Sequence, residues 1–291
     1  MIIEMSETGK EKAVKSSEPS KPLSGKRIFV CGKGGSGKSS VVALMASILH
    51  NEGHKVIVLD GDASNPGGLA RLMFGLKTGP KPLIEFFGGR EKVECPVDNP
   101  SPLTRQSDTV PVTENNIDLT EIPHEYFITK DEIVLFQVGK IKKFCEGCDG
   151  PMSKVTRDFI VTGNWVTLID VEAGIEHFGR GVEKNVDIVF VVADPTFESF
   201  LIAEKVSGFC REMGKEMVWT ILNKVQSTEM ESVMINELEK KKATVIGKVH
   251  YDPEIGKTGL MGTSIGKCTA LEDVKKIIER LEKAVLENVR E

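Results

Sequence analysis

The hydrophobic residues of this 291-residue chain follow two alternating patterns. Short runs such as VIVL and IVFVV are continuously apolar, as in strands that are buried on both faces of a sheet. Between these runs, apolar residues recur at helical spacing. The runs predict strands over residues 27–31, 55–59, 165–170, 187–193, 217–222 and 243–249. The helical spacing predicts helices over residues 39–51, 198–211, 229–241 and 271–286.

Strands that alternate with helices predict an α/β fold with a mostly parallel, twisted sheet and helices on both faces. We expect a single domain over residues 26–291. Residues 1–25 are rich in Ser, Lys, Glu and Pro, which predicts a disordered tail. Residues 76–130 are rich in Pro, Gly and acidic residues with little periodicity, so they are predicted to form an irregular insertion. In such a sheet, ligands bind at the carboxyl ends of the strands.

A glycine-rich loop, GKGGSGKS at residues 32–39, follows the first predicted strand and leads into the first predicted helix. This context is typical of a P-loop, which binds a nucleoside triphosphate with Mg²⁺. Lys38 is expected to contact the β- and γ-phosphates, and the hydroxyl of Ser39 is expected to bind Mg²⁺. The other residues expected to surround the phosphates at this helix N-terminus are Gly32, Gly34, Gly35, Ser36, Gly37 and Ser40.

A second lysine in the loop, Lys33, makes it similar to the deviant Walker A group of P-loop ATPases. That group includes positioning and partition ATPases of the MinD and ParA type, the nitrogenase iron protein (NifH) and metal-insertion ATPases. The resemblance implies an ATP-hydrolysing homodimer in which Lys33 contacts the phosphates bound by the partner subunit. There the lysine would stabilise the charge that develops in the transition state. The alternative is a solvated lysine beside the loop.

Two predicted strands end in carboxylates, in the segments VIVLDGDASN and VTLIDVEAG. Carboxylates at strand ends near a phosphate loop can hold Mg²⁺ or orient a water molecule. The resemblance implies that Asp62 positions the water, that Asp60 supports the metal shell and that Asp170 holds Mg²⁺ through water. Gly174 is expected to respond to the γ-phosphate. The alternative for Asp60 and Asp62 is an Asx turn.

The segment after the predicted strand at 217–222 begins with Asn223 and Lys224. Asn223 resembles the adenine-reading asparagine of the group, whose amide both donates and accepts hydrogen bonds. The YDPE segment at residues 251–254, with Asp252 and Pro253, resembles the loop that flanks the base. Ordinary turn chemistry is the alternative for both segments.

Cys145 and Cys148 form a C-x-x-C pair. The spacing brings two sulfurs to one metal ion, but soft thiolate sites usually need four ligands. A two-fold dimer in which each subunit gives two thiolates would complete the site. Lys142 and Lys143 lie just upstream and favour the thiolate form, and Pro151 predicts that a helix follows. A structural zinc site, a redox pair and two inert cysteines are the alternatives.

The segments VGKIKK and IDVEAGIEHFGRGVEKNVDIVFVVADPTFES resemble CooC-type ATPases, which help to insert nickel into carbon monoxide dehydrogenase. The resemblance spans residues 26–286 and is weakest over 76–130. It implies a metallochaperone with a client enzyme of the carbon monoxide dehydrogenase/acetyl-CoA synthase type. CooC proteins have C-x-C where this chain has C-x-x-C, so nickel, zinc and a [4Fe–4S] cluster all stay open.

Two other functions stay open at this stage. One is an iron–sulfur ATPase that passes electrons to a partner enzyme, as NifH does. NifH-type proteins, however, carry single, widely separated cysteines, and nothing in the sequence places Cys95 as a further ligand. The other is a positioning ATPase that needs no metal. His177, in the EAGIEH segment, is expected to be structural or to face the phosphates rather than to bind metal.

Composition adds limits on partners and location. A net charge of −5 without a basic stripe argues against nucleic-acid binding. No apolar run reaches the roughly 20 residues of a membrane span, and the N-terminus does not resemble a secretory signal. We therefore expect a cytoplasmic protein whose six cysteines do not form disulfides. The amphipathic segment at 271–286 is expected to pack on the core rather than on a membrane.

Overall fold

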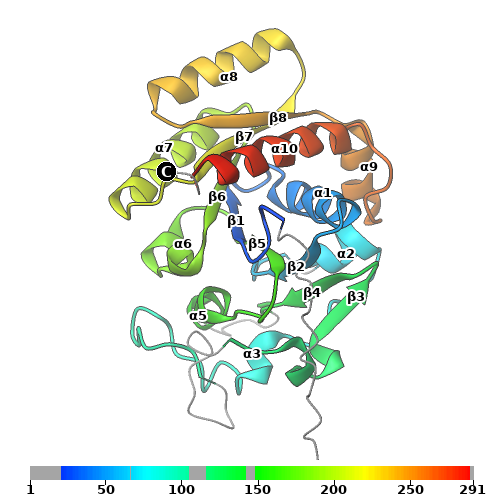
Figure 1. Cartoon of the computed structure of the whole chain (residues 1–291), viewed down its shortest axis with the longest axis vertical. Helices are drawn as coiled ribbons and strands as arrows, with labels where there is room; N and C mark the ends of the chain where they lie inside the picture. Colours follow the sequence, from blue (N-terminus) through cyan, green and yellow to red (C-terminus); the bar gives the residue numbers. More distant parts are fainter. Residues whose placement is uncertain (1–20, 66, 105–115, 142–147, 289–291) are drawn as a thin grey trace, which may run out of the picture.

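The computed structural model of the protein describes residues 21–65, 67–104, 116–141 and 148–288. Within these residues, eight strands form one sheet in the order β3-β4-β2-β5-β1-β6-β7-β8 (Figure 1). The pairs are parallel except β3 with β4, which is antiparallel. The α/β fold with a mostly parallel sheet is thus confirmed.

The strands and helices have the following bounds. The strands are β1 Arg27–Gly32, β2 Lys55–Asp60, β3 Phe127–Lys130, β4 Ile133–Gln137, β5 Trp165–Asp170, β6 Ile188–Ala193, β7 Val218–Val225 and β8 Val245–His250. The α-helices are α1 Lys38–Asn51, α2 Gly68–Phe74, α3 Leu83–Phe86, α5 Gly150–Asp158, α6 Glu176–Gly179, α7 Phe197–Glu212, α8 Thr228–Lys240, α9 Pro253–Met261 and α10 Ala270–Asn288. Short 3-10 helices are η1 Leu119–Glu121, η2 His124–Tyr126 and η3 Val182–Asn185.

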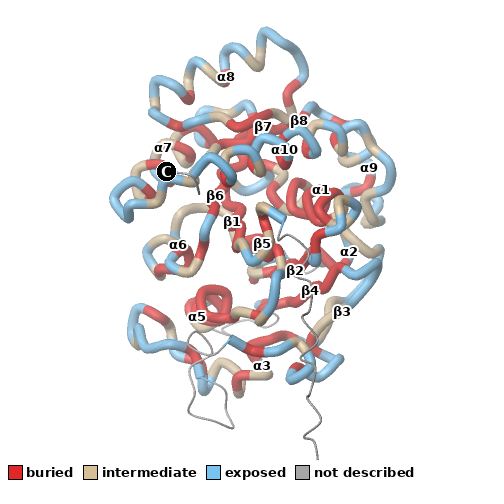
Figure 2. Tube along the Cα trace, in the orientation of Figure 1, coloured by how far each residue is buried: buried red, intermediate tan, exposed pale blue. Residues whose placement is uncertain are grey.

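Alternate residues of the central strands face two separate hydrophobic clusters. In β1, Phe29 and Cys31 pack into the cluster covered by α5, α7 and α8. Their neighbours Ile28 and Val30 pack into the cluster covered by α1, α2 and α10. This explains the continuous apolar runs in the sequence, because both faces of the strand are buried (Figure 2).

Every predicted strand and helix is present, with ends that differ by a few residues. The sequence analysis missed β3 and β4, which form an antiparallel hairpin at one edge of the sheet. Both runs are short, and the interruption by Asp131 and Glu132 looks like loop sequence. These two residues take positive φ values of 48° and 57° in the tight turn.

The chain is ordered before the end of the predicted tail. Leu23 is fully buried in the cluster that contains α1 and α10, and its carbonyl accepts a hydrogen bond from the Lys26 amide at 3.0 Å. The prediction of a disordered tail through Gly25 is therefore wrong for residues 21–25. A single buried leucine in a polar context left no periodic signal.

The last helix, α10, packs on the core as expected. Its buried side chains cover β8 and α1, and they are Val274, Ile277, Ile278, Leu281 and Val285. None of the described helices combines the length and the apolar character that crossing a membrane requires.

Removal of one buried leucine from α10 should show how much this packing contributes. Leu281 is fully buried, whereas Leu286 on the same helix is 46% exposed. We expect Leu281→Ala to lower the free energy of unfolding by about 2–5 kcal/mol, because it removes buried methyl groups and leaves a cavity. Leu286→Ala is the matched control and should cost about 0.5 kcal/mol or less. Urea titrations check both values, and equal losses would contradict the packing described.

Candidate nucleotide site and neighbouring cysteines

The phosphate loop turns tightly between β1 and α1. Gly32, Gly35 and Gly37 have φ values of 141°, 77° and 100°, which favour glycine. A side chain on Gly32 would strike the Val192 carbonyl, and one on Gly37 would strike the amide of Asn223. The loop therefore has the glycine-dependent shape that a P-loop needs to present its amides to phosphate.

Lys38, the first residue of α1, folds back over this loop. Its Nζ donates a hydrogen bond to the Lys33 carbonyl at 3.2 Å, and the residue is buried. The ammonium group thus lies over the loop at the positive end of the helix, where phosphate oxygens are favoured. The contact of Lys38 with the β- and γ-phosphates stays a prediction.

Ser39 and Asp170 form a pair suited to Mg²⁺. The Ser39 hydroxyl donates to Asp170 Oδ2 at 2.6 Å, while Asp170 Oδ1 is buried with no hydrogen-bond partner among the described residues. Burial, followed by the neighbouring Asp60, raises the pKa of Asp170 to about 7. A cation at this point would satisfy the unpaired oxygen, so the residues fit Mg²⁺. When bound, the ion would offset phosphate charge.

Asp60 differs from its expected role in the metal shell. Its Oδ1 lies 2.9 Å from Lys140 Nζ in a buried ion pair, and its Oδ2 accepts the Leu69 amide of α2 at 3.1 Å. Both oxygens are therefore engaged, and the carboxylate anchors α2 to the segment after β4. The sequence analysis did not single out Lys140, although it lies in the VGKIKK segment.

Asp62 adopts the Asx turn that was the alternative to its catalytic role. Its Oδ1 accepts hydrogen bonds from the Ser64 amide at 2.8 Å, the Ser64 hydroxyl at 2.7 Å and the Asn65 amide at 3.3 Å. The residue is only partly buried at the carboxyl end of β2. Its role in positioning water stays a prediction.

Lys33 is bound within its own subunit rather than solvated. Its Nζ donates to the Thr196 hydroxyl at 3.0 Å and lies 3.8 Å from Asp194 Oδ1. Lys224 lies 3.8 Å from the other oxygen of Asp194. Although burial opposes it, hydrogen bonds from Ser199 and Thr196, together with both lysines, lower the pKa of Asp194. Asp194 is thus a shared anion for two lysines, which the sequence analysis missed.

Three of the four predicted base-binding residues, Asn223, Lys224 and Asp252, line a small cavity of about 100 Å³ beside α1, whereas Pro253 does not. Asn223 Nδ2 donates to the Ser36 carbonyl at 2.7 Å, so the side chain is fixed against the phosphate loop. Lys224 Nζ donates to the Gly35 carbonyl at 2.5 Å. Ser40, Tyr251 and other side chains complete the wall. Binding of an adenine base by these residues stays a prediction.

Asp252 has a structural role that its sequence context did not reveal. Its Oδ1 accepts the Glu254 amide at 2.9 Å and so caps α9, in which Pro253 is the first residue. Its Oδ2 accepts the Thr269 amide and hydroxyl, both at 2.7 Å, just before α10. The carboxylate therefore holds two helix starts together and lines the cavity without pointing a free oxygen into it.

The segment after β5 connects the phosphate loop to the cysteine region. The Gly174 amide donates to the Gly32 carbonyl at 3.2 Å. A few residues further on, Arg180 forms an ion pair with Asp149, and its Nη1 lies 3.4 Å from the Ser153 hydroxyl. Asp149 and Ser153 belong to the start of α5. A continuous chain of contacts thus runs from the P-loop to the residue that follows Cys148.

The C-x-x-C pair is only partly described. Cys145 lies outside the described residues, whereas Cys148 is exposed immediately before α5. Pro151 stands in the first turn of α5, as predicted. Among the described residues, no group of three or more His, Cys, Asp or Glu side chains is arranged to hold a metal ion. Cys95, which the sequence could not place, lies beside Cys148 near Gly150.

Comparison with known proteins agrees with this geometry. The sequence profile of the CobQ/CobB/MinD/ParA nucleotide binding domain matches residues 28–265. The chain belongs to this family. It is a P-loop ATPase, with the phosphate loop described above and with relatives that are ATP-binding proteins.

Relatives within the CobQ/CobB/MinD/ParA family cover most of the chain. An uncharacterized ATP-binding protein of Methanocaldococcus jannaschii is 38% identical over 88% of this chain and 100% of its own length. The carbon monoxide dehydrogenase accessory protein CooC of Rhodospirillum rubrum is 27% identical over 88% of its length and 82% of this chain. The cell division ATPase MinD of Pyrococcus furiosus has the same fold, with a TM-score of 0.59 and 17% identity over 89% of this chain and 99% of the MinD chain.

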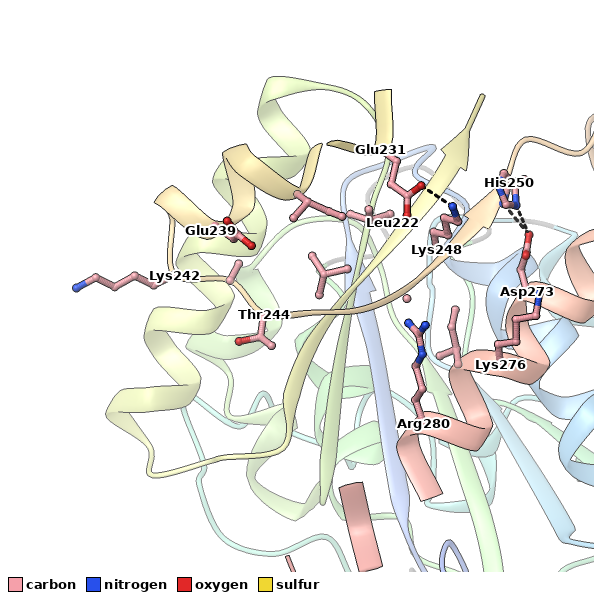
Figure 3. Close-up of a pocket in the computed structure, with 15 residues that line it drawn as sticks. Leu222, Glu231, Glu239, Lys242, Thr244, Lys248, His250, Asp273, Lys276 and Arg280 are labelled. Atoms are coloured by element: carbon pink, nitrogen blue, oxygen red, sulfur yellow. Dashed lines mark hydrogen bonds and ion pairs between the residues drawn. The ribbon is translucent and has the colours of Figure 1, made fainter. Parts of the chain in front are cut away.

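A larger groove of about 830 Å³ lies at the β8 edge of the sheet, between α8 and α10 (Figure 3). It contains none of the residues predicted to bind nucleotide. Ion pairs join Glu231 to Lys248 and His250 to Asp273 across its walls. Arg280 Nη1 donates to the carbonyl of Ile246 at 2.8 Å and so covers part of the open strand edge.

His177 is buried beside the phosphate loop in its neutral form. Its ring packs 4.9 Å from the rings of Phe29 and Phe178. Burial, followed by the charges of Lys38 and Arg180, lowers its pKa to about 3. A ring held this way packs in the core and does not face solvent, in agreement with a structural role.

The low pKa of His177 predicts that acid lowers the stability of the folded protein. The folded protein takes up this proton only near pH 3, but the unfolded chain does so near pH 6.5. The buried, neutral ring of His177 therefore makes its full contribution to the free energy of unfolding above pH 6.5. This contribution is lost as the pH falls towards 3. We expect about 2 kcal/mol of loss by pH 5, and a flatter pH profile for His177→Leu. Urea titrations between pH 7.5 and pH 5 measure this, and parallel profiles for the two proteins would contradict it.

Proposed function

We propose that this P-loop ATPase is a dimeric metallochaperone that binds a metal ion through Cys145 and Cys148 and delivers it to a client enzyme. The observation that carries the proposal is the ion pair of Arg180 with Asp149. It joins the segment after the Asp170 strand to the start of α5, which directly follows Cys148. A cysteine at this point is therefore connected to the part of the site that meets the γ-phosphate.

The connection suggests how nucleotide state would reach the metal. The Gly174 amide is bonded to the P-loop carbonyl of Gly32, so a γ-phosphate that attracts this amide would shift the segment. Arg180 lies on the same segment and holds the first turn of α5 through Asp149 and Ser153. Movement of the segment would then change the position of Cys148. ATP and metal would affect each other's affinity by the same factor.

A homodimer would complete both the nucleotide site and the metal site. Gly34 and Gly35 are exposed on the loop surface, and Lys33 lies beside them, where a partner subunit bound to MgATP would approach. In this arrangement Lys33 would leave Thr196 and Asp194 and contact the partner's phosphates, while Asp62 would orient the attacking water. Two-fold symmetry would also bring two cysteine pairs together and supply the four thiolates that a soft metal ion prefers.

The similarity to CooC, an accessory protein of carbon monoxide dehydrogenase, supports a client enzyme of the carbon monoxide dehydrogenase/acetyl-CoA synthase type. Nickel is the metal that the resemblance in sequence implies for such a client. Zinc is the other ion that four thiolates would hold. No partner that is a nucleic acid or a membrane is needed for this activity, which would take place in the cytoplasm. A [4Fe–4S] ATPase that transfers electrons and a metal-free positioning ATPase are the rival functions, and the fold alone is compatible with both.

Metal analysis with and without a non-hydrolysable ATP analogue tests the proposal. We expect a colourless dimer that binds nickel or zinc more tightly with the analogue and Mg²⁺, and a Cys145→Ala/Cys148→Ala variant that dimerises without binding metal. Light scattering after size exclusion gives the oligomeric state, and elemental analysis gives the metal. A brown protein with broad absorption in the violet-blue would favour the electron carrier. Full cellular activity of the double variant would favour the positioning ATPase.

Replacement of Arg180 should uncouple the two sites. Arg180→Met removes the ion pair with Asp149 and keeps an unbranched, largely apolar stem at this position. If coupling between ATP and metal has the usual size of roughly 5- to 150-fold, the variant should lower that factor towards one. Metal affinity measured with and without the ATP analogue gives the factor. Arg211→Met removes an arginine whose bond is to the Lys242 carbonyl and serves as the control. An unchanged factor in the Arg180 variant would place the coupling elsewhere.

A further inference from the structure

We propose that Cys95 and Cys148 bind one thiophilic metal ion together. The proposal rests on the proposed function, which gives Cys148 a metal, and it adds Cys95 as a ligand from the insertion. Cys95 lies more than fifty residues upstream in sequence and belongs to no recognisable cysteine motif. The fold, however, brings the two thiols to the same side of one glycine.

Gly150 locates both sulfurs. A Cβ atom built on this glycine would lie 2.6 Å from Cys95 Sγ and 3.3 Å from Cys148 Sγ. The two sulfurs can therefore be no farther apart than the sum of these distances. Two thiolates bound to one tetrahedral zinc ion, each at about 2.3 Å, are roughly 3.8 Å apart. Small side-chain rotations would thus be enough for both sulfurs to reach one ion.

The absence of a side chain at Gly150 creates the space for these sulfurs. The glycine is in the first turn of α5, and its φ lies outside the range that only glycine tolerates. Backbone conformation therefore does not require glycine here, and alanine would be the better helix former. What requires glycine is the approach of Cys95, whose Cβ would also lie 3.0 Å from an added methyl group.

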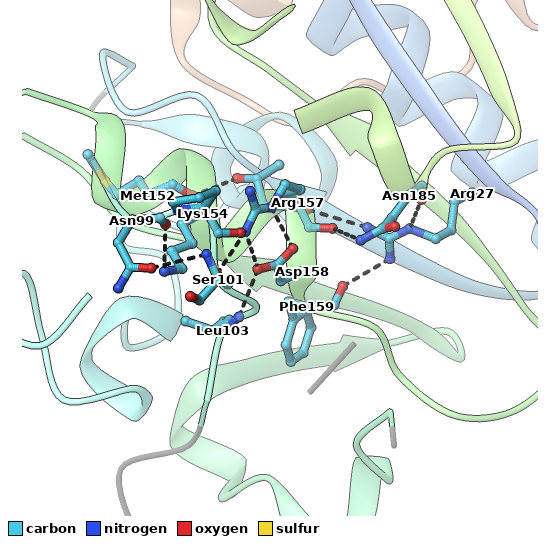
Figure 4. A network of polar contacts seen from close by, with 12 residues as sticks. Arg27, Asn99, Ser101, Leu103, Met152, Lys154, Arg157, Asp158, Phe159 and Asn185 are labelled. Carbon is cyan, nitrogen blue, oxygen red and sulfur yellow. Dashed lines mark hydrogen bonds and ion pairs between the residues drawn. The ribbon is translucent and has the colours of Figure 1, made fainter. Parts of the chain in front are cut away.

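Buried polar contacts hold the Cys95 loop against α5 (Figure 4). Lys154 Nζ donates to the Asn99 carbonyl at 3.0 Å, and Asp158 Oδ2 accepts the Leu103 amide at 2.8 Å. The Asn99 amide in turn donates to the Cys95 carbonyl at 2.9 Å. Lys154 and Asp158 are almost fully buried, so these contacts are costly to break. The same helix that starts after Cys148 thus fixes the loop that carries Cys95.

A helix N-terminus and an arginine lie beside the two thiols. Helix α5 begins two residues after Cys148, so the thiol lies near the N-terminus of this helix. Arg90 Nη1 donates to the Cys148 carbonyl at 2.7 Å, which brings a guanidinium group next to the pair. Cys95 is partly buried and Cys148 is exposed. One ligand is therefore held by the protein core while the other faces solvent, as transfer of the ion to a client would require.

The proposal changes how the site is shared in a dimer. With Cys95 and Cys148 together, one subunit offers two thiolates whose separation is set by its own fold. Cys145 lies outside the described residues, and the proposal does not depend on its position. A single subunit would then hold the ion weakly without nucleotide, and closure of a dimer would add ligands to an ion already bound.

Cobalt titration of the full-length protein tests this assignment. Reduced protein is titrated anaerobically with Co²⁺ alone, and the thiolate-to-cobalt charge-transfer absorption reports how many sulfurs bind. We expect Cys95→Ser and Cys148→Ser each to weaken binding and to lower this absorption. The loss should reach at least the roughly 10- to 100-fold that even outer contacts of metal sites contribute. Cys268→Ser removes a distant, partly buried thiol and should titrate like the wild type.

A glycine variant makes the same test without removing a thiol. Gly150→Ala leaves every cysteine in place but fills the space between the two sulfurs, and it should weaken Co²⁺ binding as Cys95→Ser does. Gly208→Ala, in helix α7 where an added methyl group meets no neighbouring atom within 4 Å, is the control. Circular dichroism confirms that each variant is folded.

The possible results separate this inference from the proposed function. If Cys148→Ser loses the cobalt signal while Cys95→Ser and Gly150→Ala keep it in full, Cys95 is not a ligand and the proposed function stands. If the wild-type protein gives no charge-transfer absorption with Co²⁺ alone, the pair of Cys95 and Cys148 is not a metal site. The proposed function is then decided by the same titration in the presence of the ATP analogue and Mg²⁺. Equal losses in Cys95→Ser, Cys148→Ser and Gly150→Ala, with both controls unchanged, establish the pair.

Discussion

The hydrogen bond from Ser39 to the buried carboxylate of Asp170 is the contact on which the rest of the site depends. It joins the start of α1 to the end of β5 and thereby fixes the position of the phosphate loop relative to the sheet. The carboxylate is held at that point by strands on both sides, since β5 pairs with β1 and with β2. A buried carboxylate with one unpaired oxygen costs free energy, and a bound cation would provide the missing partner. The unpaired oxygen of Asp170 is therefore the feature of this edge of the sheet that a bound Mg²⁺ ion would satisfy.

Local patterns in the sequence were enough to predict the sheet and the P-loop. The apolar runs that became β1 and β6 are buried on both faces, and the GKGGSGKS segment sets its own backbone through glycine. Long-range pairings were beyond such patterns. Lys140 reads as one more surface lysine in VGKIKK until the fold places it 2.9 Å from Asp60. Asp252 reads as a base-flanking residue until two helix starts are seen to share its carboxylate. In each case the partner comes from a distant part of the chain, and no spacing rule encodes it.

The insertion predicted from Leu76 to Lys130 also makes long-range contacts that its local sequence does not reveal. Its Pro and Gly content gave no sign that Phe87 and Leu103 are buried in the core. Through them the insertion packs on α5, the helix that also receives Arg180 from the segment after β5. A helix held on one side by the nucleotide segment and on the other by the insertion is well placed to relate the two. In the proposed coupling, a movement of the segment after β5 would therefore reach the cysteines through α5, which is a single short helix.

The guanidinium of Arg280 over the Ile246 carbonyl has a consequence for how copies of this protein can meet. An uncovered edge strand invites another chain to extend the sheet, and proteins commonly block such edges with charge. Here the β8 edge is flanked by α8 and α10 and carries this charged cover. Side-by-side growth of the sheet into a filament or aggregate is thus discouraged at this edge. Face-to-face association through the loops at the carboxyl ends of the strands is left as the easier route.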